Sequence, residues 1–218
     1  MLERIIRSEA HFAAMLFCEL RKPSATGERF LGTIESAIGE PLGEITHVFV
    51  EPAPFRDTWV TLDTSDRWRL VNRLLHWADP VVDPAQISSM FNELEDEIRS
   101  PASWDKQEMQ GASSMVERLR FMFRARPDLL VITTKFAVWI ELKVDSKSRQ
   151  PRNGYYQPDT QQHIAEAAHL VVPELTDRRY LNLVIQREPS PKPLHFTWQQ
   201  IVGGESGWEF DVLKPRNR

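Results

Sequence analysis

The sequence is poor in the residues that build covalent or zinc-based scaffolds. Cys18 is the only cysteine among 218 residues, which excludes an intramolecular disulfide, and no Cys/His spacing of a zinc site occurs. No run approaches the ~20 apolar residues that span a bilayer. Polar residues interrupt the apolar ones after Met1, which argues against a cleavable leader. We therefore expect a cytoplasmic protein with no membrane partner and a core built by packing alone.

Net positive charge is also missing, because the formal net charge is −4. A protein that coats nucleic acid is usually basic overall, so the composition does not by itself point to one. The distribution of charge is more informative. The segment 117–152 holds nine Lys and Arg residues against four Asp and Glu residues, a local balance of +5. Positive charge is thus concentrated in one stretch of the chain.

Hydrophobic periodicity predicts helices and strands that alternate along the chain. Apolar residues at helical spacing predict helices over 4–21, 28–38, 65–79, 84–99 and 158–171. Apolar, β-branched runs predict strands over 45–50, 129–132, 136–144 and 180–185, with 59–62 as a candidate partner of the first. Thr197 is expected to cap a turn of helix within 195–201.

This order of elements favours an α/β fold with a central mixed β-sheet and helices on both of its faces. At this length one domain is the default, so we expect a single domain over 1–218. The segment 45–110 is expected to be a largely helical insertion within it.

Glu141 and Lys143 lie on one face of the predicted strand 137–144, whereas the other face is entirely aliphatic. Charged side chains on a buried strand cost free energy unless they have partners. Glu141 and Lys143 therefore need either each other, in a structural salt bridge, or a bound metal ion.

A tight hairpin would bring Asp128 to this face. The preceding strand can return through a two-residue loop at 134–135 or a four-residue loop at 133–136. In both cases the residue numbers of each cross-strand pair sum to 269, so Asp128 lies opposite Glu141. Opposed residues have Cβ atoms about 5 Å apart, so both carboxylates could bind one ion. The loop lacks the Gly or Asn that tight hairpins prefer, and an odd loop length would shift the register by one.

Two carboxylates and the backbone carbonyl of Leu142 are hard oxygen ligands, which suit Mg²⁺ or Mn²⁺. Such an ion acidifies a bound water and neutralises the charge that develops on phosphorus, and a lysine beside it stabilises the same charge. Asp128, Glu141 and Lys143 are therefore candidate catalytic residues for the hydrolysis of phosphodiester bonds.

Pro127-Asp128, followed thirteen positions later by Glu141-Leu142-Lys143, resembles the motif of the PD-(D/E)xK nuclease superfamily. The resemblance implies a restriction-endonuclease-like fold, with Mg²⁺ or Mn²⁺ bound by Asp128 and Glu141 and with Lys143 as the catalytic lysine. It also implies a DNA endonuclease of the bacterial restriction or antiviral defence type.

Further residues of the site follow from the resemblance alone. A glutamate on an earlier helix often completes the metal site in this superfamily, which makes Glu9 a candidate ligand. A glutamine at the start of the helix after the ExK strand is common too, often with a tyrosine four positions later. Gln157 and Gln161 are the candidates for this auxiliary residue, although neither is followed by that tyrosine.

The basic residues around the motif are candidate contacts to the nucleic-acid backbone. They are Arg124, Arg126, Lys147, Arg149 and Arg152. DNA is the expected partner, with RNA as the alternative substrate, and the chain could act as a homodimer or as a subunit of a multi-protein defence complex. A catalytically silent scaffold with the nuclease fold is the non-enzymatic alternative.

Overall fold

The computed structural model describes residues 4–6, 9–78, 100–103, 113–143, 157–203 and 208–210. Its contacts divide the chain into two compact units, each built from more than one segment. The first, which we call the sheet unit, comprises residues 1–52, 127–154 and 178–218. The second, which we call the helical unit, comprises residues 53–126 and 155–177.

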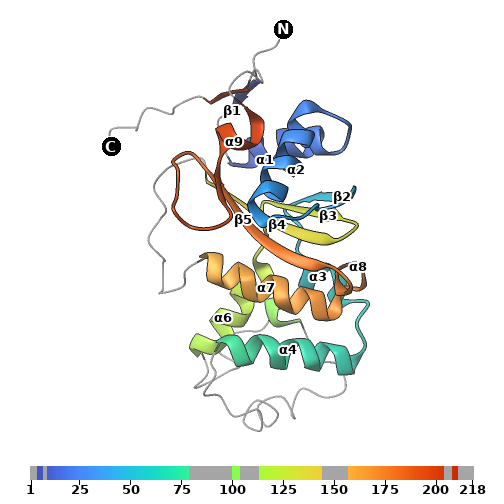
Figure 1. Cartoon of the computed structure of the whole chain (residues 1–218). Helices are drawn as coiled ribbons and strands as arrows, with labels where there is room; N and C mark the ends of the chain where they lie inside the picture. Colours follow the sequence, from blue (N-terminus) through green and yellow to red (C-terminus); the bar gives the residue numbers. More distant parts are fainter. Residues whose placement is uncertain are drawn as a thin grey trace, which may run out of the picture. The chain divides into compact units, whose positions relative to one another are not determined.

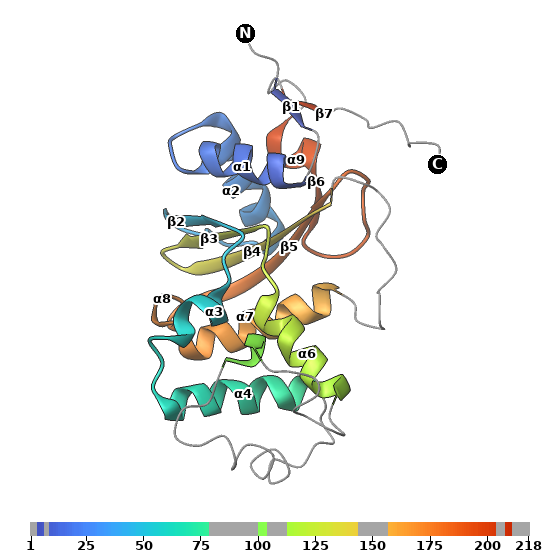
Figure 2. The same ribbon diagram turned by 180° about the vertical axis from the view of Figure 1, so that it is seen from behind.

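A five-stranded mixed sheet is the centre of the sheet unit (Figures 1 and 2). Its order is β2–β3–β4–β5–β6, in which β2/β3 and β3/β4 pair antiparallel while β4/β5 and β5/β6 pair parallel. The strands are β2 (Ile45–Val50), β3 (Leu129–Thr133), β4 (Phe136–Lys143), β5 (Arg179–Gln186) and β6 (His195–Thr197). A separate parallel pair joins β1 (Arg4–Ile6) to β7 (Trp208–Phe210).

Three helices lie together on one side of this sheet in both views of the fold (Figures 1 and 2). They are α1 (Glu9–Leu20), α2 (Ala25–Ile38) and α9 (Trp198–Val202). Ser24 caps α2 by accepting a hydrogen bond from the Gly27 amide at 3.0 Å. Thr197 and Gln200 form a reciprocal capping box at the start of α9, which confirms the cap predicted at Thr197.

Alternate residues of the central strands pack against these helices. The shared core includes Phe12, Leu16, Phe30, Ile34, Leu129, Val131, Val138, Ile140, Leu142, Leu183, Ile185, Trp198 and Ile201. Because side chains on a strand alternate between faces, Glu141 and Lys143 lie on the face of β4 turned away from this core. The aliphatic face predicted for β4 is thus confirmed at Val138, Ile140 and Leu142.

The helical unit contains six short or medium helices in its described part. They are α3 (Pro54–Trp59), α4 (Thr64–Ala78), the 3₁₀ helix η1 (Pro101–Ser103), α6 (Ser113–Arg124), α7 (Gln157–Val171) and α8 (Pro173–Thr176). Within the described ranges, no helix of either unit has the length and apolar character needed to cross a membrane.

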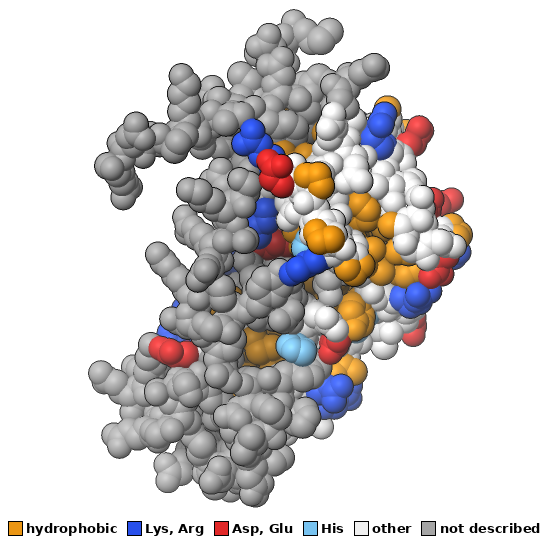
Figure 3. All heavy atoms as spheres, turned by 60° about the vertical axis from the view of Figure 1, so that its left-hand side comes forward, with side chains coloured by type: hydrophobic (Ala, Val, Ile, Leu, Met, Phe, Trp, Pro, Cys, Tyr) orange, Lys and Arg blue, Asp and Glu red, His pale blue; other side chains and the backbone are white. Residues whose placement is uncertain are grey.

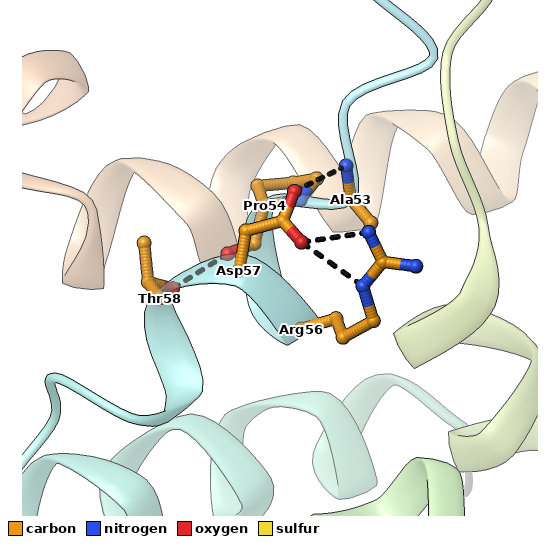
Figure 4. A network of polar contacts seen from close by, with 5 residues as sticks. All are labelled: Ala53, Pro54, Arg56, Asp57 and Thr58. Atoms are coloured by element: carbon orange, nitrogen blue, oxygen red, sulfur yellow. Dashed lines mark hydrogen bonds and ion pairs between the residues drawn. The ribbon is translucent and has the colours of Figure 1, made fainter.

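Polar contacts fix the start of α3, as Figure 4 shows. Asp57 accepts a hydrogen bond from the Ala53 amide at 3.2 Å, and its other carboxylate oxygen accepts two from Arg56 at 2.9 and 2.8 Å. Pro54 occupies the first turn, where a missing amide hydrogen costs nothing. The predicted strand over 59–62 is wrong, because residues 54–59 form α3 and β3 is the strand that pairs with β2.

Most other elements follow the predictions. The mixed sheet of an α/β protein is confirmed, as are the strands beginning at Ile45, Leu129, Phe136 and near Tyr180. The first helix begins at Glu9 instead of residue 4, because residues 4–6 form β1. The helix predicted over 84–99 lies outside the described residues. The expectation of one domain with an insertion over 45–110 stays a prediction.

The hairpin between β3 and β4 turns through Thr134 and Lys135, without glycine or asparagine. Thr133 compensates for this with its buried hydroxyl, which donates to the Leu42 carbonyl at 2.6 Å and accepts from the Phe136 amide at 2.9 Å. Gly43 allows the close approach of the preceding loop: its φ is +83°, and an added Cβ would overlap the Thr134 hydroxyl. The turn is thus fixed by contacts to a distant loop.

Candidate functional site

Asp128 stands directly before β3 and opposite Glu141. The pairs Leu129↔Ile140, Leu130↔Trp139, Val131↔Val138 and Ile132↔Ala137 all have numbers that sum to 269. The predicted register is therefore confirmed, and its next position places Asp128 across from Glu141. The Asp128 side chain lies toward β4, because its Oδ2 accepts a hydrogen bond from the Leu142 amide at 2.7 Å.

Glu141 is a buried carboxylate, with 3% of its side chain exposed. Its Oε1 forms a short ion pair with Nζ of Lys143, two residues further along the same face of β4. The lysine side chain is more accessible, with 27% of its surface exposed. A buried carboxylate without a cationic partner would cost several kcal/mol, and Lys143 supplies that partner.

The carboxyl group of Asp128 titrates far from its ordinary range. Burial raises its pKa from 3.8 to about 7, and the negative charge of Glu141 acts in the same direction. The hydrogen bond from Leu142 and the positive charge of Lys143 lower the pKa but do not offset the rise. The raised pKa therefore reflects mainly the removal of this carboxyl group from water.

Glu9 belongs to the same cluster. It occupies the first turn of α1, where the partial positive charge of a helix N-terminus favours an acidic side chain. Its charge contributes to raising the pKa of Asp128, which shows that the two carboxyl groups lie within electrostatic reach of each other. Asp128, Glu141 and Lys143 form the closer group at the hairpin, and Glu9 is the smallest of the charges that act on Asp128.

The backbone of Leu142 also takes part in this arrangement. Its amide points toward β3, because it donates to Asp128. The amide and carbonyl of one strand residue point to the same side of the strand, so the Leu142 carbonyl lies on the side of Asp128 too. This direction matches the predicted role of that carbonyl as an oxygen ligand, which stays a prediction.

The donor chemistry of this cluster fits Mg²⁺ or Mn²⁺. Across the described residues, no group of three or more His, Cys, Asp or Glu side chains is arranged to hold a metal ion. Magnesium sites of phosphate-processing enzymes do not need such a cage, because one or two carboxylates together with water and substrate phosphate complete the coordination. Asp128 and Glu141 supply two carboxylates of this kind on neighbouring strands.

Other predicted site residues belong to the helical unit or fall outside the described part. Gln157 begins α7, and Gln161 is buried within that helix. Arg124 and Arg126 are both exposed, at the end of α6 and just after it. Lys147, Arg149 and Arg152 lie outside the described residues. In the part of the chain coloured in Figure 3, basic and acidic side chains are interspersed without a broad patch of one sign.

Two supporting residues were not predicted from the sequence. The Glu51 amide donates to the backbone carbonyl of Asp128 at 3.0 Å, which extends the pairing of β2 and β3 by one residue. Glu51 holds a φ of +46°, a left-handed conformation that is uncommon for a residue with a side chain. Thr133 fixes the turn that sets the register. The only sequence signal for the role of Glu51 was the pair Glu51-Pro52 at the end of an apolar run.

Comparison with known proteins identifies no relative: no protein-family model, curated protein or solved structure matches the chain.

Proposed function

We propose that this protein is a Mg²⁺- or Mn²⁺-dependent endonuclease of the restriction-endonuclease-like class, which hydrolyses phosphodiester bonds in DNA. The observation that supports the proposal most strongly is the hairpin register, which sets Asp128 opposite Glu141 and keeps Lys143 on the same face. Metal binding by both carboxylates requires this register, because a shift of one residue would turn Asp128 and Glu141 to opposite faces of the sheet.

The residues of the cluster have distinct parts in this chemistry. Asp128 and Glu141, with the Leu142 carbonyl, would hold the cation, while Glu9 adds only its negative charge near Asp128. Bound there, the cation would polarise the phosphate and acidify a water molecule. The Lys143 ammonium stabilises the negative charge that develops as water adds to phosphorus and the bond to the leaving oxygen breaks. Glu141 holds that ammonium in place through the ion pair.

Incubation of the purified full chain with supercoiled plasmid DNA tests the proposal. We expect nicked and linear products with Mg²⁺ or Mn²⁺ and none with EDTA. Lys143→Ala should abolish cleavage, whereas Lys135→Ala, which removes an exposed lysine from the turn at the other end of β4, should leave it unchanged. Parallel reactions with linear DNA and with RNA separate an endonuclease that cuts DNA from an RNase.

Retained cleavage in Lys143→Ala or in Asp128→Ala would refute the assignment of the site. Absence of cleavage with both metals on all three substrates would refute the enzymatic proposal as a whole. In that case the second candidate function applies, a catalytically silent scaffold of a defence assembly. The ion pair between Glu141 and Lys143 favours that candidate, because it is complete without a metal.

The biological setting that we propose is bacterial defence against foreign DNA, and its only support is the resemblance of the motif. Cleavage of unmodified DNA with sparing of DNA from the producing cell is the result expected of such an enzyme. Equal cleavage of both would contradict it.

A further inference from the structure

The helix α6 exposes an aromatic residue among arginines. Phe121 has 48% of its surface exposed, although the same helix buries Leu119, Met122 and Phe123. The segment 117–126 contains four arginines and one glutamate, a balance of +3. The exposed ring and the surplus positive charge thus lie within ten residues of the helical unit, 117–126.

The spacing of α6 explains which residues share its outer surface. Phe123 faces inward, where its ring lies 5.5 Å from that of Phe55 and 5.2 Å from that of Trp59. Phe121 and Arg124 are three positions apart, which places them side by side on the opposite, outer side. Arg120 precedes the exposed ring, and Arg126 follows the helix and is itself exposed.

Arg124 is held in a defined place on this surface. Its Nη2 donates to the Ala102 carbonyl at 2.8 Å, which uses one of the five donors of the guanidinium. The remaining donors can still bind an anion. Arg124 thus has one hydrogen bond to the protein and remains exposed to solvent.

We propose that the surface formed by Arg120, Phe121, Arg124 and Arg126, the α6 surface, binds unpaired nucleotides. Bases stack on exposed aromatic rings, and arginines at their sides bind the phosphates; together these are the chemistry of sites for single-stranded nucleic acid. A base inside a duplex is already stacked and cannot cover Phe121 without leaving its neighbours. The surface thus discriminates single strands and frayed or unpaired segments from intact duplex.

This inference rests on the proposed function only for the identity of the ligand as nucleic acid. It adds a substrate preference, namely unpaired over paired bases, and a binding residue, Phe121, that the hydrolytic cluster does not require. Its test measures binding without cleavage, so that the two proposals can fail separately.

The test is fluorescence anisotropy with the full wild-type chain in EDTA. The probes are a labelled single-stranded DNA of about 20 nucleotides, longer than one binding site, the duplex of the same sequence, and the corresponding single-stranded RNA. We expect the single strands to bind at least about 10-fold more tightly than the duplex, since loss of stacking on one base has an effect of that order.

Variants then locate the binding surface. Phe121→Ala should weaken single-strand binding by about 10-fold and leave duplex binding unchanged, while Phe121→Trp should retain it. Val60→Ala is the matched apolar control, because Val60 is 76% exposed in the same unit. Arg124→Ala should weaken binding to every probe and lower the salt dependence, whereas Arg56→Ala should not, since Asp57 already holds that guanidinium.

A duplex that binds as tightly as the single strand, or a Phe121→Ala variant that behaves like Val60→Ala, would overturn this inference. Loss of RNA binding with DNA binding retained would restrict the ligand to single-stranded DNA and still support it. If the α6 surface binds single strands while no substrate is cleaved, the nuclease proposal fails and this inference stands. If plasmid is cleaved but Phe121→Ala binds normally, the reverse holds.

Discussion

Replacement of Asp128 by asparagine should make the protein more stable at alkaline pH. Asparagine keeps the shape of the side chain and an oxygen that can accept the hydrogen bond from the Leu142 amide. It removes the carboxylate. In the folded protein, burial and the charge of Glu141 raise the pKa of this group from 3.8 to about 7. The variant therefore isolates the free-energy cost of keeping this charge in the cluster.

The sign and size of the effect follow from proton linkage. Between pH 3.8 and about 7 the folded state holds the Asp128 proton more tightly than the unfolded state does, so stability falls as the pH rises through this range. Above pH 7 the charged carboxylate destabilises the folded state by up to about 4 kcal/mol, at roughly 1.4 kcal/mol for each tenfold change in proton affinity. Asp128→Asn should recover most of this above pH 7 and none of it below about pH 4.

Urea unfolding of both proteins over this pH range measures the difference. Asp177→Asn is the matched control, because it removes the same formal charge from an exposed position of the helical unit. The reasoning is refuted if Asp128→Asn is no more stable than the wild type at about pH 8, or if its advantage does not shrink as the pH falls.

Four other measurements probe the same structure. Millimolar Mg²⁺ should raise the urea midpoint of the wild type above pH 7 but not that of the Asp128 variant, and an equal rise in both would contradict metal binding at the cluster. Lys143→Met should cost about 3 kcal/mol of unfolding free energy, part of which an added Glu141→Gln restores, because the single change removes the cationic partner of the buried Glu141 carboxylate. Thr133→Val should cost about 1–3 kcal/mol and lower cleavage, since it removes the hydroxyl that accepts from the Phe136 amide; an unchanged midpoint would refute its role in the turn. Asp57→Ala should cost about 1 kcal/mol, as measured by thermal or urea unfolding, because it removes the acceptor of the Ala53 amide hydrogen bond at the start of α3; an unchanged unfolding free energy would refute this role.

The register of the hairpin could be predicted because the sequence pattern that indicates it lies within 16 residues. The alternation of β4 and the length of the loop fix the register, and the aliphatic face identifies the core side. The sequence did not reveal why a turn without glycine is stable there. That explanation needs Thr133 and the Leu42 carbonyl, which are 91 positions apart.

Long-range pairings account for what could not be predicted. The partner of β2 is β3, which follows it after the whole of α3, α4 and α6, so nothing near residue 50 identifies it. Likewise, β1 pairs with a strand some 200 positions away, and its three residues fit the helical pattern equally well. The proximity of Glu9 to Asp128 was expected from the family resemblance alone, because no local pattern connects the two residues.

The route of the chain between the two units has a consequence for how the protein can be divided. The helical unit is made of 53–126 and 155–177, and the segment that carries Asp128, Glu141 and Lys143 runs between these two stretches. Neither unit is therefore a continuous piece of the chain that a single truncation could isolate. A deletion within 53–126 leaves the helices of 155–177 in place, and the reverse is also true. The helical unit can therefore be removed only by two excisions, one on either side of the segment 127–154 that carries the hairpin.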